Sequence, residues 1–202
     1  MTTNAIMKNF KETLFDMQQH NIPLPAGKVE IRIPLARQIL TDMLTLFIER
    51  EGRQLIWLPE YDQVAEWLSD NEGRGLFLYG NCGRGKSLIC RYVIPAILLT
   101  YCRKVVSVFD VQQMNRDVDL VLSKHIIYID DIGTEEVSNH YGNKRMAFAE
   151  IMDAAEKQNK LVMVSTNLDI SGLRAMYGDR VVDRIRSTTR RIVFGGDSLR
   201  GR

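Results

Sequence analysis

Short apolar runs alternate with segments of helical periodicity along most of the chain. The run Ile126-Ile-Tyr-Ile129 is apolar without interruption, which is typical of a strand covered on both faces of a sheet. Strands are predicted at 75–79, 105–109, 126–130, 161–166 and 191–194. Helices are predicted between them, at about 86–101, 112–122, 143–158 and 177–186. This alternation predicts an α/β fold in which helices flank a parallel five-stranded sheet.

A small helical region is predicted ahead of this alternation, at residues 1–51, and the α/β domain is predicted at residues 52–202. Two segments of the N-terminal region carry apolar residues at helical spacing: Met7, Phe10, Leu14 and Met17, then Ala36, Leu40, Met43 and Phe47. A linker with two prolines, residues 21–25, separates them. The N-terminal region either docks a partner protein or packs onto the core of its own chain.

Composition excludes several classes of protein. The 202 residues are 45% hydrophobic and 26% charged, which is typical of a globular protein with one main core. No run of about 18 uncharged apolar residues exists, so neither a membrane span nor a membrane partner is expected. Charged residues between Lys8 and Asp16 interrupt any signal-peptide core. The three cysteines form no C-x-x-C pair, which disfavours a disulfide framework and a zinc site, so we expect a cytoplasmic protein.

The eight residues from Gly80 to Ser87, GNCGRGKS, match the phosphate-binding pattern G-x-x-x-x-G-K-[ST]. They follow a predicted strand and precede a predicted helix, so backbone N–H groups and the positive helix end can converge on phosphate oxygens. Gly83 and Gly85 permit close backbone approach, Lys86 can neutralise the outer phosphates, and the Ser87 hydroxyl can ligate Mg²⁺. The residues predicted to contact the nucleotide are Gly80, Asn81, Cys82, Gly83, Arg84, Gly85, Lys86, Ser87 and Leu88.

Polar residues at the ends of two later strands complete the predicted site. The third strand ends in Asp130 and Asp131, forty-four residues after Lys86. An acid after an apolar strand is what a phosphate-loop ATPase uses to hold Mg²⁺, and we assign Asp130 to this role. Asp131 follows where related enzymes orient the attacking water, and it is one methylene shorter than the more usual glutamate, which predicts slow hydrolysis. Asn167 follows the fourth strand, where it can reach the outer phosphate or the water.

The C-terminal end of the chain is basic. Between residues 174 and 202 there are eight arginines and no lysine, against three aspartates. Guanidinium groups in this stretch can neutralise nucleic-acid phosphates or contact a nucleotide. Arg180 and Arg184 are four residues apart, so they share one helix face.

The order of these motifs resembles that of AAA+ ATPases of the DnaC-like replicative-helicase-loader type and of their relatives, the IstB-like transposition helpers. The resemblance covers about residues 52–202. It is carried by the phosphate loop, by IIYIDDIG and VSTN, by GDRVVDRIR at 178–186, and by the closing GDSLRGR at 196–202. The phosphate loop and IIYIDDIG are shared with many phosphate-loop NTPases, whereas GDRVVDRIR and the closing segment are far more specific.

The resemblance implies ATP as the nucleotide, bound between neighbouring subunits of a homo-oligomer or a mixed assembly. It assigns an arginine finger that acts on the next protomer to Arg184, with Arg180 as second choice, and a second nucleotide sensor to Arg200. The chain ends eight residues after Phe194, so no C-terminal helical lid is expected, as in the loader branch. Residues 110–125 leave room for one short helix, whereas family members typically insert a helical motif there that lines a path for single-stranded DNA. Single-stranded DNA stays a candidate partner.

The leading interpretation is an AAA+ protein that binds ATP with Mg²⁺, hydrolyses it slowly, and acts in DNA replication as a helicase loader or adaptor. Its partner is then a replicative DNA helicase. Two alternatives remain open: a transposition helper whose partner is a transposase, and a nucleotide-gated binding module without significant hydrolysis. A small-molecule kinase is disfavoured because no acceptor-binding insertion is visible.

Overall fold

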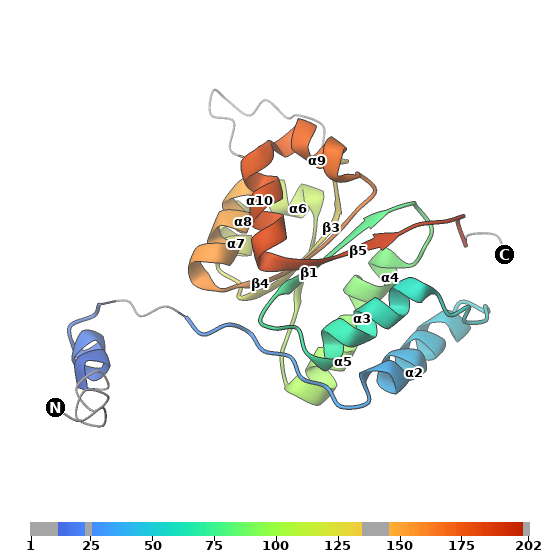
Figure 1. Ribbon diagram of the computed structural model, residues 1–202, viewed down its shortest axis with the longest axis horizontal. Coiled ribbons are helices and arrows are strands. Elements are labelled where there is room, and N and C mark those ends of the chain that lie inside the picture. The colour runs from blue at the N-terminus through green and yellow to red at the C-terminus, as the bar shows by residue number, and fades with distance from the viewer. Residues whose placement is uncertain (1–11, 23–25, 135–145, 200–202) are drawn as a thin grey trace.

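The computed structural model describes residues 12–22, 26–134 and 146–199, and within them a five-stranded parallel sheet forms the centre of the protein (Figure 1). The strands are β1 (Gly75–Gly80), β2 (Ser107–Asp110), β3 (Ile126–Ile132), β4 (Leu161–Thr166) and β5 (Thr189–Phe194), in the order β2-β3-β4-β1-β5. Every pairing is parallel. The predicted α/β fold is confirmed, and each predicted strand is present within two residues of its bounds.

Helices cover both faces of the sheet, so alternate strand residues enter two separate cores. On one face, Leu76 and Leu78 pack with α2 (Ala36–Glu49), α3 (Pro59–Ser69) and α5 (Ile94–Cys102). On the other face, Phe77 packs with α6 (Val111–Arg116), α7 (Val118–Leu122), α8 (Ala147–Gln158), α9 (Ile170–Tyr177) and α10 (Asp179–Thr188). Burial on both faces explains why the strands are apolar throughout.

The predicted helix at 112–122 is two helices, α6 and α7. The Asp110 side chain accepts a hydrogen bond from the Gln113 N–H at 2.7 Å and caps α6, and Asp117 accepts one from the Leu120 N–H at 2.9 Å and caps α7. A side chain that caps a new helix start satisfies orphan N–H groups there, which favours a break at Asp117 over a continuous helix. Helix α9 was not expected, and it begins at a cap of the same kind, because Asp169 accepts from the Gly172 N–H.

The helix that follows the phosphate loop is also interrupted. It consists of α4 (Lys86–Leu88), a π-helical turn η1 (Ile89–Val93) and α5, where one continuous helix at 86–101 was expected. Pro95 lies at the start of α5, and a proline in a regular helix would clash with the carbonyl group four residues earlier, at Arg91. The wider turn, in which the Ile94 N–H bonds to the Ile89 carbonyl, avoids this clash.

Part of the N-terminal region packs onto the core of the chain. Leu40 and Leu44 of α2 are fully buried in the same cluster as Trp67 of α3. The segment before α2 is held to the end of α3 by Asn71, which accepts from the Ile31 N–H at 2.8 Å and donates to the Val29 carbonyl at 2.9 Å. Residues 12–19 are helical as predicted, and the rest of the predicted first helix lies outside the described residues. The boundary between residues 51 and 52 remains a prediction.

Candidate nucleotide site

The phosphate loop lies at the carboxyl end of β1, between the strand and α4. Gly83 and Gly85 have φ angles of 76° and 90°, in the left-handed region that glycine adopts without strain. At Gly80, a Cβ atom would lie 2.5 Å from the carbonyl oxygen of Phe194 in the neighbouring strand β5. The glycines of the motif are therefore required by the backbone as the structure has it.

The Lys86 ammonium is held at the base of this loop. The residue is 6% exposed, and its Nζ donates to the carbonyl oxygens of Gly80 at 2.8 Å and Asn81 at 2.7 Å. Nζ also donates to Oδ1 of Asn167 at 3.0 Å, and Asn167 in turn donates from Nδ2 to Oδ1 of Asp131 at 3.0 Å. Three residues predicted separately therefore form one hydrogen-bonded chain, Lys86–Asn167–Asp131.

Asp131 reaches this chain because β3 bulges at its end. The register between β3 and β4 shifts between Ile129 and Ile132, and Asp131 has a φ angle of 58°, which is uncommon for a residue with a side chain. The Asp131 N–H donates to the Ser165 hydroxyl at 3.1 Å, and its carbonyl accepts from Thr134 at 2.9 Å. The bulge thus places two consecutive carboxylates, Asp130 and Asp131, at the same end of the sheet.

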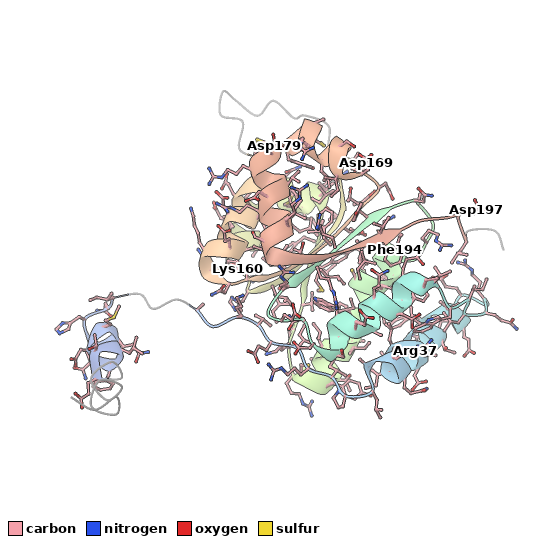
Figure 2. All side chains as sticks on the ribbon, viewed as in Figure 1. Arg37, Lys160, Asp169, Asp179, Phe194 and Asp197 are labelled. Atoms are coloured by element: carbon pink, nitrogen blue, oxygen red, sulfur yellow. The ribbon has the colours of Figure 1, made fainter. Side chains whose placement is uncertain are left out.

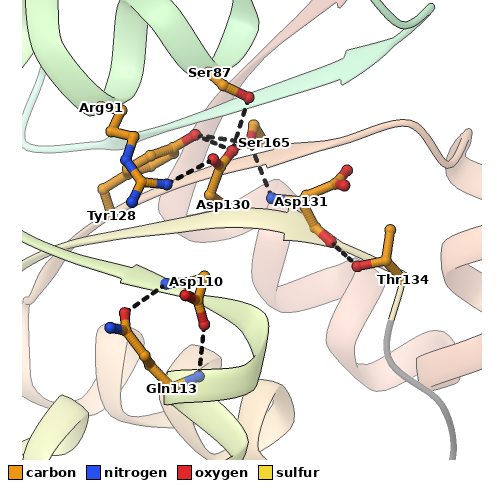
Figure 3. A network of polar contacts seen from close by, with 9 residues as sticks. All are labelled: Ser87, Arg91, Asp110, Gln113, Tyr128, Asp130, Asp131, Thr134 and Ser165. Carbon is orange, nitrogen blue, oxygen red and sulfur yellow. Dashed lines mark hydrogen bonds and ion pairs between the residues drawn. The ribbon is translucent and has the colours of Figure 1, made fainter.

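Asp130 lies in a dense network of hydrogen bonds (Figure 3). Its Oδ1 accepts from three hydroxyl groups, those of Ser87 at 2.8 Å, Tyr128 at 2.5 Å and Ser165 at 2.6 Å. Its Oδ2 pairs with Nη1 of Arg91 at 3.3 Å. Burial alone would raise the pKa of Asp130, but these hydrogen bonds and the nearby guanidinium outweigh it and lower the pKa, so the carboxylate is ionised at neutral pH.

The pair Ser87 and Asp130 fits a bound Mg²⁺ that is shared with phosphate groups. Because the Ser87 hydroxyl donates its hydrogen to Asp130, both of its lone pairs remain for a metal ion. Among the described residues, no group of three or more histidine, cysteine or acidic side chains could hold a metal by itself. Mg²⁺ usually keeps a few protein ligands and takes the others from water and phosphate oxygens, which matches this sparse donor set.

A cavity of about 360 Å³ opens beside the loop. Its lining includes residues 82–87 of the phosphate loop, Asp131, Ser165 and Asn167, whereas Asp130 contacts the lining residue Ser87 but is not itself part of the lining. The rest of the lining consists of residues to which the sequence assigned no role: Ile48, Glu51, Arg53, Gln54, Ile56, Tyr61 and Leu199. This volume and this mixture of apolar and polar lining suit a nucleotide-sized ligand.

The segment after β5 runs along the phosphate loop (Figure 2, where Phe194 and Asp197 are labelled). The Leu199 N–H donates to the Gly83 carbonyl at 2.9 Å, and Nδ2 of Asn81 donates to the Gly196 carbonyl at 2.8 Å. Arg84 of the loop pairs with Glu60 at 3.0 Å. Arg200, the predicted second sensor, lies outside the described residues.

Comparison with known proteins assigns the chain to a family. The sequence model of the family described as novel STAND NTPase 3 matches residues 55–176, more than half of the chain. The chain belongs to this NTPase family. Among curated proteins, no significant match is found.

Solved structures share the fold of this NTPase. A DnaC helicase loader is 18% identical, with a TM-score of 0.53, and the match covers 81% of this chain and 93% of the loader. DnaI is 21% identical, with a TM-score of 0.50 and coverage of 63% and 73%. DnaA of Aquifex aeolicus bound to AMPPCP is 15% identical, with a TM-score of 0.51, and the match covers 71% of this chain but only 49% of DnaA. These matches confirm the expected fold.

Arg180 and Arg184 lie away from the NTPase's own cavity, on α10. Nη1 of Arg184 pairs with Glu156 at 2.7 Å and its Nε with Asp153 at 3.3 Å, both on α8. Arg180 pairs with the other oxygen of Asp153 at 2.5 Å. The structure therefore brings the predicted loop, acids and Asn167 together and leaves the two predicted finger arginines at a separate surface.

Sequence reasoning missed several polar residues of the NTPase site. Tyr128 and Ser165 lie inside strands, where they read as ordinary strand residues, and Arg91 reads as a helix residue. Their contacts with Asp130 come from three different elements. One signal was present in the sequence: a tyrosine two residues before the acid lies on the same face of the strand as that acid.

None of the helices in the described ranges combines the length and the apolar character that a membrane crossing requires.

Proposed function

We propose that this NTPase binds ATP with Mg²⁺ in the cavity beside the phosphate loop and hydrolyses it slowly. The observation that carries the proposal is that two polar groups meet at this cavity: the chain Lys86–Asn167–Asp131, and the pair Ser87–Asp130, of which Ser87 lines the cavity. They supply a cation for phosphate oxygens, oxygen ligands for a metal and a carboxylate for a water molecule.

Each side chain then has a defined task. Lys86 neutralises the outer phosphates, and its carbonyl partners hold the ammonium in place, so little side-chain entropy is lost on binding. Ser87 and Asp130 hold Mg²⁺, which when bound withdraws charge from the phosphate oxygens. Asp131 accepts a hydrogen bond from Asn167, and both are assigned to orienting the attacking water. The short Asp131 side chain supports a low rate.

We also propose that Arg184 acts in trans, as a finger that reaches the nucleotide of a neighbouring protomer, with Arg180 as second choice. Neither side chain lines the cavity of its own protomer, which supports a role at the site of a neighbouring protomer. The assembly is a homo-oligomer or a mixed one, and Arg200 is the proposed second sensor. An isolated protomer then has little activity, because a finger contributes roughly 10³- to 10⁵-fold to the rate.

For the biological role, we propose a helicase loader or adaptor that works in the cytoplasm during DNA replication. The shared fold extends over 93% of a DnaC helicase loader, against 49% of DnaA, which supports the loader type. Within the predicted N-terminal region, residues 1–51, the part that does not pack onto the core of the chain is the proposed docking element for the helicase. A transposition helper would use the same site with a transposase, and single-stranded DNA is a further proposed ligand.

Nucleotide binding is tested by calorimetry with Mg·ATP on the native protein and on Lys86→Ala. We expect the variant to lose on the order of 100-fold in affinity, because two or more charge-assisted contacts to phosphate are lost. Lys157→Ala, which removes an exposed lysine on α8, is the matched control and should bind as the native protein does. Equal affinities of the native and Lys86→Ala proteins would refute the site.

The partner is tested by affinity capture with a non-hydrolysable ATP analogue present, followed by mass spectrometry, with Lys86→Ala as the negative control. Nucleotide-dependent recovery of a replicative helicase supports the loader role. Recovery of a transposase instead would favour the transposition helper. If partners are captured only with the analogue bound but no phosphate release is measured in any mixture, the protein is a nucleotide-gated binding module.

A further inference from the structure

Arg91 lies in the π-helical turn between α4 and α5, one helical turn beyond the phosphate loop. The turn is closed by the bond from the Ile94 N–H to the Ile89 carbonyl, and Pro95 follows it directly. π turns inside α-helices occur frequently at functional sites, because they change the direction in which one side chain points. Figure 3 shows the Arg91 side chain directed at Asp130.

The two oxygens of the Asp130 carboxylate have different partners. All three hydroxyl donors meet Oδ1, whereas Oδ2 faces the Arg91 guanidinium at 3.3 Å. The Asp130 side chain is 14% exposed and that of Arg91 is 38% exposed, so the two charges interact in a partly desolvated environment. A positive charge at this position opposes a second cation beside Asp130 and attracts an anion there.

We propose that Arg91 is a positioning residue that makes the metal site dependent on the nucleotide. Its charge offsets that of Asp130, so a divalent cation alone binds weakly, and the cation enters together with the triphosphate, whose own negative charge compensates for Arg91. This role rests on the proposed Mg·ATP site. It predicts opposite effects for the two ligands when the charge is removed, whereas a purely structural residue would weaken both.

The test compares the native protein with Arg91→Gln. Mn²⁺ binding without nucleotide is measured from the electron paramagnetic resonance signal of the free ion, and Mg·ATP binding is measured by calorimetry. We expect Arg91→Gln to bind Mn²⁺ roughly three- to tenfold more tightly and Mg·ATP weaker by a similar factor, because solvent screens part of the lost charge. Arg91→Lys keeps the charge and should resemble the native protein in both measurements.

Two controls locate the effect. Arg103→Gln removes one charge from the far end of the same helical run, about 18 Å away along the helix axis, and should change neither affinity. In the double variant Arg91→Gln/Asp130→Asn, the gain in Mn²⁺ affinity should disappear. Unchanged or weaker Mn²⁺ binding by Arg91→Gln overturns the proposal, as does a gain that survives the loss of Asp130. If no variant binds Mg·ATP, the proposed function fails, but the Mn²⁺ comparison still decides the role of Arg91.

Discussion

The buried ion pair between Glu60 and Arg84 allows a sharp test of how the phosphate loop is held in place. Nη2 of Arg84 lies 3.0 Å from Oε1 of Glu60, and the two side chains are 12% and 10% exposed. The same carboxylate oxygen accepts from the Gly195 N–H at 3.1 Å. One carboxylate on α3 therefore joins the phosphate loop to the segment after β5, and the substitution to test is Glu60→Gln.

The expected cost of Glu60→Gln is about 3 kcal/mol of unfolding free energy. Removing one partner of a buried ion pair costs about 3–5 kcal/mol, because the other charge stays buried without compensation. The lower end applies here, since the glutamine oxygen can still accept from Gly195 and Arg84 still donates to the Asp197 carbonyl at 3.3 Å. In urea denaturation, this corresponds to a fall in the midpoint of about 1 M for a protein with an m-value of about 3 kcal/mol/M.

Glu66→Gln provides the matched control on the same helix. Glu66 pairs with Arg190 at 3.5 Å, but its side chain is 65% exposed, so the same substitution should cost less than about 1 kcal/mol. The double variant Glu60→Gln/Arg84→Met leaves neither charge of this pair buried. Its loss of unfolding free energy should therefore be about 2 kcal/mol smaller than the sum of the losses of the two single variants. If Glu60→Gln and Glu66→Gln shift the midpoint equally, the reasoning about buried charge is wrong.

Two further predictions concern turnover. Asp131→Asn should keep Mg·ATP affinity in calorimetry but lower the rate of phosphate release by about 10²-fold, because the amide can still pair with Asn167 but cannot accept a proton; an unchanged rate would reassign the water-orienting role. Arg184→Ala and Lys86→Ala proteins should each be inactive alone yet regain phosphate release when mixed, since a shared interface then combines an intact loop with an intact finger. Failure to complement, with assembly confirmed by light scattering, would count against a finger in trans.

The positions of the strands could be predicted because they depend on patterns that are local in the chain. Runs such as Leu161–Thr166 are buried on both faces, so their apolar character is continuous and their ends are marked by polar residues. Helix boundaries were harder. Asp117 and Asp169 become caps only when particular N–H groups lie within reach, and either residue is also compatible with a continuing helix or a loop.

The residues that line the candidate site also differ in how far they could be predicted from the sequence. The grouping of Lys86, Asp130 and Asn167 could be predicted because each lies at or just beyond the carboxyl end of a predicted strand. Parallel strands bring their carboxyl ends to one edge of a sheet. The other lining residues follow no such rule. Gln54, Tyr61 and Leu199 line the same cavity although up to 145 residues separate them, and only the packing of α2, α3 and the final segment brings them there.

The intrachain pairing of Arg184 is compatible with a role in trans when the energies are compared. Its side chain is 25% exposed, and those of its partners Asp153 and Glu156 are 26% and 37% exposed, so each pair is partly solvated. Such pairs contribute roughly 0.2–1 kcal/mol each, so releasing Arg184 from these two carboxylates costs at most about 2 kcal/mol. A finger that accelerates hydrolysis by 10³- to 10⁵-fold contributes about 4–7 kcal/mol to the transition state. The α8 carboxylates can therefore hold Arg184 in the free protomer without preventing its transfer to a neighbour's nucleotide, and they would keep the free protomer from presenting an uncompensated charge.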